Sequence, residues 1–279
     1  MNDPTTFLVL GATGKLGRRV AARLRLLGLP VRAASRSSAT PFDWTDPDRW
    51  DAALRDTAAV FVVPPSTPGP VHEFAARAAA AGVRHLVLLS GRGADTWGDS
   101  AFGRDMRDAE DAVRASGLDW TILRPNNFAQ NFDEELWHAP LLDGELALPA
   151  GDVGEPFIDL EDVADVAVRV LTEPDAHVGR VHELSGPRAI TFAEAVDLVS
   201  RATGRPITYR RVTPDEYVEA LVGQGVDHDG AEHVAEMFAL MDRGLIATPT
   251  DGVADVLGRP ARTFTDYVLR VAVTGAWHR

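Results

Sequence analysis

The segment FLVLGATGKLGRRV, residues 7–20, decides the fold of this chain of 279 residues. The apolar run Phe7–Leu10 predicts a buried strand, glycines follow at every third position, and an apolar-periodic helix comes next. Gly11 allows a tight turn, Gly14 lets the backbone approach a pyrophosphate, and Gly17 lets the helix pack close to the strand. This arrangement predicts a dinucleotide-binding loop, with an ordinary glycine-rich turn as the alternative. The residues expected to bind the cofactor here are Gly11, Thr13, Gly14, Lys15, Leu16 and Gly17.

Charge and composition exclude several classes of protein. The net charge of -13 argues against a nucleic-acid partner, which would require clustered Lys and Arg. The chain has no cysteine, so disulfides and thiol nucleophiles are excluded. The N-terminus has neither the basic flank nor the long apolar stretch of a signal peptide or a membrane span. We therefore expect a cytoplasmic protein without a membrane partner, as a monomer or homodimer acting on a small molecule.

The end of the second predicted strand, residues 30–36, bears on the choice of cofactor. In a doubly wound sheet this end lies beside the adenosine ribose, where an NAD site places Asp or Glu. Ser35 and Arg36 stand there instead. A guanidinium and a hydroxyl suit a 2′-phosphate, so we expect NADP(H), with a solvated loop arginine as the alternative.

Further cofactor contacts are expected where other strands end. Asp43 could accept a hydrogen bond from the adenine amine with Trp44 packed nearby, although a plain helix-capping turn fits equally well. The nicotinamide half is expected near the ends of three later strands, because ligands of open α/β sheets bind there. The residues concerned are Val63, Pro64, Pro65, Ser90, Pro125 and Asn126.

Strands and helices alternate up to about residue 125, which predicts an α/β fold. We expect a Rossmann-type doubly wound parallel sheet with a smaller C-terminal α/β substrate domain. The expected division is an NADP-binding domain over residues 1–150, to whose sheet residues 151–185 return, and a mostly helical substrate-binding domain over residues 186–279.

Some local patterns support narrower expectations. Residues 142–148 resemble a hairpin, and Thr191 with Glu194 predicts a capping box at a helix start. His85 is expected at the surface. The Gly/Asp/His-rich stretch over residues 223–230 lacks a rigid ligand spacing, so we interpret it as a mobile lid or connector and expect no metal.

By the sixth strand the chain resembles the NmrA-like family of atypical short-chain dehydrogenases/reductases. The resemblance covers about 210 residues and implies an NADP-binding Rossmann domain with a small C-terminal substrate domain. The segments Phe42-Asp43-Trp44 and Val63-Pro64-Pro65 are similar to a subgroup that includes festuclavine dehydrogenase-type enzymes. The segments that support the family are residues 11–17, Arg36, and residues 81–87, 116–125 and 162–164.

Standard short-chain reductases carry Tyr-x-x-x-Lys on the helix after the fifth strand, where the tyrosine donates a proton to a carbonyl oxygen. Alignment on Glu110 places Phe102 and Met106 at these two positions. The sole lysine of the chain is Lys15, so the dyad cannot form anywhere. Ser90 could mark the position of the usual serine. The pocket residues expected near the nicotinamide are Ser90, Phe102, Met106, Asn127, Phe128 and Asn131.

Without the dyad, hydride transfer to an already electrophilic carbon is the leading hypothesis, because general acid assistance contributes about 10²–10⁴ in rate. An imine, iminium or activated alkene of a small aromatic or polycyclic substrate would meet that requirement. Phe102 and Met106 could equally be core residues, and Asn126 or Asn127 could simply cap a turn. Two other functions remain open at this point. One is a non-catalytic NADP(H) sensor that binds a partner protein, and the other is a non-redox enzyme on the same scaffold.

Overall fold

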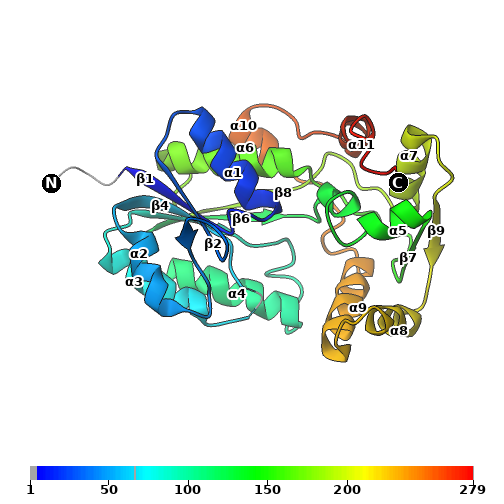
Figure 1. The fold of residues 1–279 in the computed structure, drawn as a ribbon, viewed down its shortest axis with the longest axis horizontal. Helices are drawn as coiled ribbons and strands as arrows, with labels where there is room; N and C mark the ends of the chain where they lie inside the picture. The colour runs from blue at the N-terminus through cyan, green and yellow to red at the C-terminus, as the bar shows by residue number, and fades with distance from the viewer. Residues whose placement is uncertain (1–4, 66, 279) are drawn as a thin grey trace.

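A seven-stranded parallel sheet organises one half of the molecule in the computed structural model, which describes residues 5–65 and 67–278 (Figure 1). The strand order is β3-β2-β1-β4-β5-β6-β8, which extends the doubly wound order by one strand and confirms the Rossmann-type prediction. The strands are β1 (Thr6–Leu10), β2 (Val31–Ser35), β3 (Thr40–Pro41), β4 (Thr57–Val62), β5 (His85–Leu89), β6 (Asp119–Pro125) and β8 (Arg180–Leu184).

Helices cover both faces of this sheet (Figure 1). Because side chains alternate along a strand, Val9 of β1 joins the core cluster on one face, whereas Leu8 and Leu10 join the cluster on the other. One face carries α1 (Lys15–Leu26), α6 (Leu160–Thr172) and α10 (Gly252–Leu257). The other carries α2 (Trp50–Leu54), α3 (Pro70–Ala80) and α4 (Ala101–Arg114). Short 3₁₀ turns are η1 (Pro47–Arg49), η2 (Ala129–Phe132) and η3 (Pro174–Ala176).

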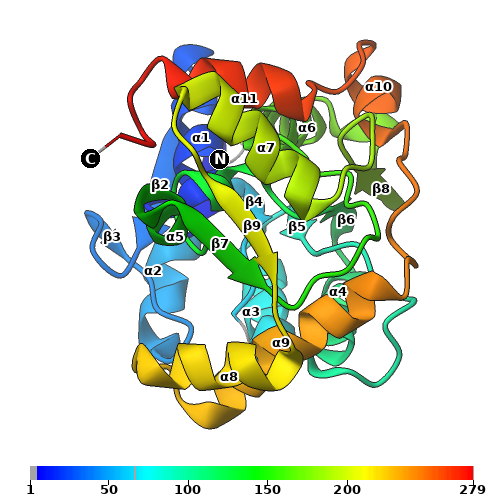
Figure 2. The same ribbon diagram turned by 90° about the vertical axis from the view of Figure 1, so that its right-hand side faces the viewer.

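A second group of elements lies beyond the carboxyl ends of the strands, and Figure 2 shows it from the front. It has an aromatic core of its own in which Phe132, Trp137, Phe157 and Phe192 are fully buried. This second part, with the parallel pair β7-β9, agrees with the smaller C-terminal α/β part that was expected. Its elements are α5 (His138–Asp143), β7 (Glu145–Leu148), α7 (Phe192–Thr203), β9 (Thr208–Arg211), α8 (Pro214–Gly223), α9 (His228–Asp242) and α11 (Phe264–Ala272).

The two parts interleave along the chain. Residues 145–148 pair with residues 208–211, whereas Val253 and Val256 of α10 pack in the core beneath the large sheet. The expected boundaries between the NADP-binding and substrate-binding domains, at residues 150 and 186, therefore remain a prediction.

The hairpin expected at residues 142–148 is wrong. Asp143 ends α5, and Gly144 is its C-terminal cap with φ of +94°. β7 then pairs in parallel with β9, where Leu146 lies opposite Tyr209. The Asp-Gly pair that suggested a hairpin turn is a helix cap instead, because the pairing partner lies far away in the sequence.

The connector expected at residues 223–230 is shorter than predicted. The Asp227 side chain accepts a hydrogen bond from Gly230 N at 2.9 Å, so α9 begins at His228, inside the stretch expected to be a connector. At the start of α7, by contrast, the predicted capping box between Thr191 and Glu194 is confirmed.

His85 is buried, which corrects its expected surface position. Thr121 Oγ1 donates to the carbonyl of His177, so it accepts from His85 Nε2 at 3.0 Å. This leaves His85 Nδ1 buried and without a hydrogen-bond partner among the described residues. A second proton on the ring would have no acceptor, and burial accordingly lowers the pKa of His85 to about 4.

We predict that His85 weakens the fold in acid. In the unfolded chain the imidazole binds a proton near pH 6.5, whereas the folded chain resists protonation until about pH 4. The stabilisation is thus complete above pH 6.5 and is lost progressively as the pH falls to about 4. Urea unfolding at several pH values across this window gives the free energy of unfolding. Its slope against pH should be smaller in His85→Leu than in the wild type, by up to ~1.4 kcal/mol per pH unit. Equal slopes in both proteins would contradict this account.

Candidate functional site

The glycine loop between β1 and α1 depends on two conformational features. Gly11 has φ of +61°, a region that side chains disfavour, and its carbonyl accepts from Gly14 N at 2.9 Å. A Cβ on Gly17 would lie 2.2 Å from Gly11 O, closer than any real contact. The first turn of α1 therefore packs directly on the loop, which fits the role expected for Gly17.

The N-terminus of α1 suits an anion. Gly14 is the N-cap, and within the described chain no side chain caps this helix and no acid stands in its first turn. Its N–H groups and dipole are therefore available to a phosphate. Leu16 is buried beneath the loop. Lys15 Nζ lies 2.6 Å from Asn131 Oδ1 and 2.6 Å from Glu135 Oε2, so it points to the segment after β6.

A pocket of about 580 Å³ begins at the glycine loop and runs along the ends of β1, β2 and β4. It brings residues that the sequence assigned to the adenosine half of a cofactor together with Val63, Pro64 and Pro65, which were expected at the nicotinamide half, whereas Ser90, Pro125 and Asn126 do not line it. The predicted residues that line it are Gly11, Thr13, Gly14, Ser35, Arg36, Asp43, Trp44, Val63, Pro64 and Pro65, and Ser37, Phe42 and Thr45 complete it.

Ser35 is the most informative residue of this pocket. Its Oγ is buried and has no hydrogen-bond partner among the described residues, which is costly for a polar atom. Arg36, directly after it, is exposed and lines the same pocket. An orphaned hydroxyl beside a guanidinium fits an anionic oxygen, such as the 2′-phosphate of NADP(H).

Asp43 and Trp44 have local partners. Asp43 Oδ1 accepts from the backbone N of Thr45 at 2.9 Å and from its hydroxyl at 2.8 Å, and these bonds lower the pKa of the carboxyl. This is an Asx turn and not the helix-capping turn that the sequence left open, because Asp46 is the N-cap of η1. Trp44 Nε1 donates to Val63 O at 3.1 Å, which joins the end of β4 to the loop after β3.

A charged network lies beneath the tips of β5 and β6. Glu110 of α4 is fully buried and accepts from Ser90 Oγ at 2.7 Å and from Arg124 Nε and a second Arg124 nitrogen at 2.8 Å each. Burial alone would raise the pKa of Glu110, but the hydrogen bonds from Arg124 and Ser90 hold it below its ordinary value. The Ser90 hydroxyl is therefore committed to a carboxylate.

Asn126, which follows β6, fastens three segments together. Its Nδ2 donates to Glu155 Oε1 at 2.8 Å and to Ile246 O at 3.1 Å, and its Oδ1 accepts from Arg92 at 3.2 Å. Glu155 also accepts from Asn127 N at 3.1 Å, and burial raises the pKa of its carboxyl. The Asn126 side chain thus holds the strand tip in place. Pro125, just before it, is buried, and its carbonyl accepts from Arg92 N.

The expected substrate-side residues surround these tips. Met106 Sδ lies 2.8 Å from where a Cβ on Gly91 would stand, so its thioether covers the residue after Ser90. Phe102 packs edge-on against Trp97 with ring centroids 6.4 Å apart. Phe128 and Asn131 lie at η2, where Lys15 Nζ stands 5.9 Å from the Phe128 ring centroid.

Several residues of this region were not predicted from the sequence. Arg92 donates to Thr248 O at 2.7 Å and so ties the α9–α10 connector to the sheet. Met241 of α9 lies 3.5 Å from Asn127 Nδ2. Trp97 Nε1 is buried without a partner in the described chain. The sequence offered a signal only for Arg92, which stands two residues after Ser90 at a strand end.

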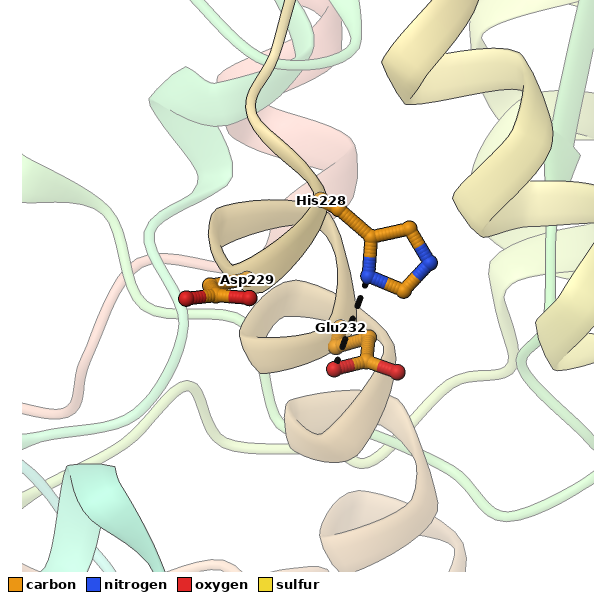
Figure 3. Close-up of side chains that lie close together, drawn as sticks. All are labelled: His228, Asp229 and Glu232. Carbon is orange, nitrogen blue, oxygen red and sulfur yellow. Dashed lines mark ion pairs between the residues drawn. The ribbon is translucent and has the colours of Figure 1, made fainter.

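A small acidic cluster lies apart from this site on the first turn of α9 (Figure 3). His228, Asp229 and Glu232 are exposed, and their ligand atoms lie within 4.8 Å of one another. The ion pair drawn in Figure 3, from His228 Nδ1 to Glu232 Oε2, spans 3.7 Å. Exposed acidic groups of this kind are common on helices without a bound ion. We therefore assign these side chains to the solvated face of α9.

Comparisons with known proteins agree with this geometry. A family model described as NAD(P)H-binding matches residues 11–174. The chain is 34% identical to an NAD(P)H azoreductase of Xenophilus azovorans, over 93% of this chain and 96% of the relative. It is 37% identical to a (4-alkanoyl-5-oxo-2,5-dihydrofuran-3-yl)methyl phosphate reductase of Streptomyces griseus, over 93% and 95%. In fold it is similar to an NADPH-dependent quinone oxidoreductase of Escherichia coli in complex with NADPH, with a TM-score of 0.82, 24% identity, and 95% and 99% of the two chains covered.

The fold, the glycine loop and the relatives define an NAD(P)H-binding, NAD(P)H-dependent oxidoreductase. The chain belongs to the NAD(P)H-binding family, within the NmrA-like atypical short-chain dehydrogenases/reductases. No helix in the described part of the chain is long and apolar enough to cross a membrane.

We predict different consequences for alanine substitutions at Gly17 and at Gly14. Gly17→Ala places a Cβ against backbone and should destabilise the fold by about 1–3 kcal/mol or more. Gly14→Ala meets Gly11 O at 3.2 Å with φ of -77°, so the fold should tolerate it while NADPH binding weakens. Thermal unfolding and NADPH titration of both variants test this. Equal melting temperatures would contradict the close-packing role of Gly17.

Proposed function

We propose that the chain is an NADPH-dependent reductase that reduces an activated double bond in a flat, uncharged aromatic acceptor, without a tyrosine–lysine relay. Quinones, azo compounds, conjugated alkenes and neutral cyclic imines form this class. The observation that carries the proposal is the pairing of a cofactor pocket with an α4 helix that presents Phe102 and Met106 where a relay would stand.

The preference for NADPH rests on Ser35 and Arg36. Ser35 Oγ lacks a partner in the described chain, and Arg36 lines the same pocket, so both are available to a 2′-phosphate. The glycine loop and the N-terminus of α1 would hold the pyrophosphate. When bound, NADPH supplies a hydride.

Lys15 and Ser90 do not provide an acid at the strand tips, and the raised pKa of Glu155 belongs to a buried carboxyl that already accepts from Asn126 and Asn127. The chain has one lysine, and Lys15 is paired with Glu135. Ser90 donates a hydrogen bond to the Glu110 carboxylate, whose pKa is lowered, so the pair resists giving a proton to a substrate. What these residues supply is rigidity and orientation, and orientation alone can account for a large part of a rate enhancement.

The acceptor must therefore be electrophilic before it binds. An unactivated ketone would lose the roughly 10²–10⁴ that general acid assistance provides, whereas a quinone or an azo bond in conjugation needs less help. The names of the relatives point to acceptors of this kind: an azo compound, an unsaturated furanone and a quinone.

The charges around the site favour an uncharged acceptor over a phosphate ester. Arg124 is bound to Glu110 and, at 2.6 Å, to Asp95. Arg92 already donates hydrogen bonds to the Thr248 carbonyl and to Asn126 Oδ1. Since these cations already have partners, a phosphate group would have to break an existing pairing. This chain and its furanone phosphate relative are thus proposed to differ in substrate.

Replacing Arg36 tests the cofactor preference. Arg36→Ala should weaken NADPH binding about 10- to 100-fold, because hydrogen bonds to charged groups contribute about 1.5–3 kcal/mol. NADH binding should change little. Arg25→Ala, an exposed arginine near the end of α1, is the matched control and should alter neither affinity. An equal loss for NADPH and NADH would show that Arg36 does not select the 2′-phosphate.

Turnover tests the reaction itself. Purified protein should oxidise NADPH with at least one of a neutral quinone, an azo dye, a conjugated enone or a cyclic imine, followed by the loss of NADPH absorbance. A phosphate ester of a matching acceptor should react more slowly than its uncharged parent. Tight NADPH binding with no turnover of any acceptor would overturn the proposal and favour a cofactor sensor.

A further inference from the structure

Two methionine sulfurs cover the ends of two neighbouring strands. Met106 Sδ of α4 lies over Gly91, two residues beyond β5, and Met241 Sδ of α9 lies 3.5 Å from Asn127 Nδ2, two residues beyond β6. β5 and β6 are paired to their tips, with Leu89 opposite Leu123. The two thioethers therefore approach one place from different parts of the molecule, outside the carboxyl ends of adjacent strands.

The position of Met241 is fixed by its neighbours in the chain. The carboxylate of Asp242 accepts from Gly151 N at 2.9 and 3.1 Å. A few residues later, the carbonyls of Ile246 and Thr248 accept from Arg92, whose backbone follows Gly91. The C-terminal end of α9 is thus held on both sides of the strand tips, and Met241 cannot leave them without breaking these bonds.

Methionine suits a surface that must accept ring systems of different size. Its side chain is unbranched and bends easily, and its sulfur makes favourable contacts with aromatic edges. The chain has four methionines, and two of them stand at this place. Phe102 and Phe128, both partly buried, add aromatic surface nearby.

We infer that Met241 determines substrate specificity: with Met106 it forms an adaptable apolar wall that admits flat aromatic acceptors of more than one ring count. The inference rests on the proposed reductase function and adds to it the residue that sets acceptor size. The sulfur of Met241 bends aside for a larger ring and returns to contact a smaller one.

The experiment compares a monocyclic with a tricyclic quinone. Met241→Ala removes the wall, so the kcat/KM ratio of tricyclic to monocyclic acceptor should rise about tenfold, as the smaller ring loses its contact. Met241→Leu conserves volume and so retains the fold, but its branched side chain bends less. It should lower kcat/KM for the tricyclic acceptor, so the ratio moves in the opposite direction. Calorimetric binding of both quinones to the protein with NADP+ should show the same two shifts in Kd.

Met237→Ala is the matched control. Met237 stands one turn earlier on α9, is partly buried, and packs against the same C-terminal aromatic core in which Met241 is buried. A purely structural role of Met241 would reduce both acceptors equally in all three variants, and this would overturn the inference. If the wild type binds NADPH but reduces neither quinone nor any other acceptor, the proposed function itself fails. If the wild type is active and both Met241 variants keep its ratio, only the inference fails.

Discussion

The close approach between Gly17 and the carbonyl of Gly11 is the constraint on which the rest of the structure depends. Because no Cβ separates them, α1 begins directly against the turn that leaves β1, and its free N–H groups open at the edge of the sheet. The same approach presses α1 onto α6, where Arg19 and Arg23 bind the carboxylate of Glu161 at 2.7 Å and less. The cofactor loop and the helical layer are thus consequences of one missing side chain.

The two ends of the site are built by different means. The end proposed for the adenosine half is made of strand ends and the short loops that directly follow them, such as Ser35 at the end of β2 and Arg36 just after it. The substrate end is assembled from distant segments. Asn126 joins Glu155 and Ile246, and Arg92 reaches the connector after α9. An end made of local turns can be inferred from the sequence, whereas an end made of distant contacts needs the folded chain.

This difference decides how much of the molecule the sequence could predict. The doubly wound parallel sheet and the capping box at Thr191 follow from local patterns, and these predictions are confirmed. Those for residues 142–148 and for His85 were wrong, because β7 finds its partner in β9 and His85 is covered by Thr121 and the chain near His177. Met241 could not be predicted at all, since nothing near it in the sequence indicates that α9 ends over β6.

The ion pair between Glu110 and Arg124 connects the fold to the chemistry. Both groups are buried, and the loss of their hydration is balanced by the hydrogen bonds between them, by those from Ser90 and Arg114 to Glu110, and by the one from Arg124 to Asp95. The serine hydroxyl is therefore part of what stabilises the buried charge. Redirecting it to a substrate oxygen would leave Glu110 with one donor fewer, which is costly in an environment of low polarity. Glu110 of α4 thus holds the strand tips rigid, which supports the proposal that the acceptor itself must be electrophilic.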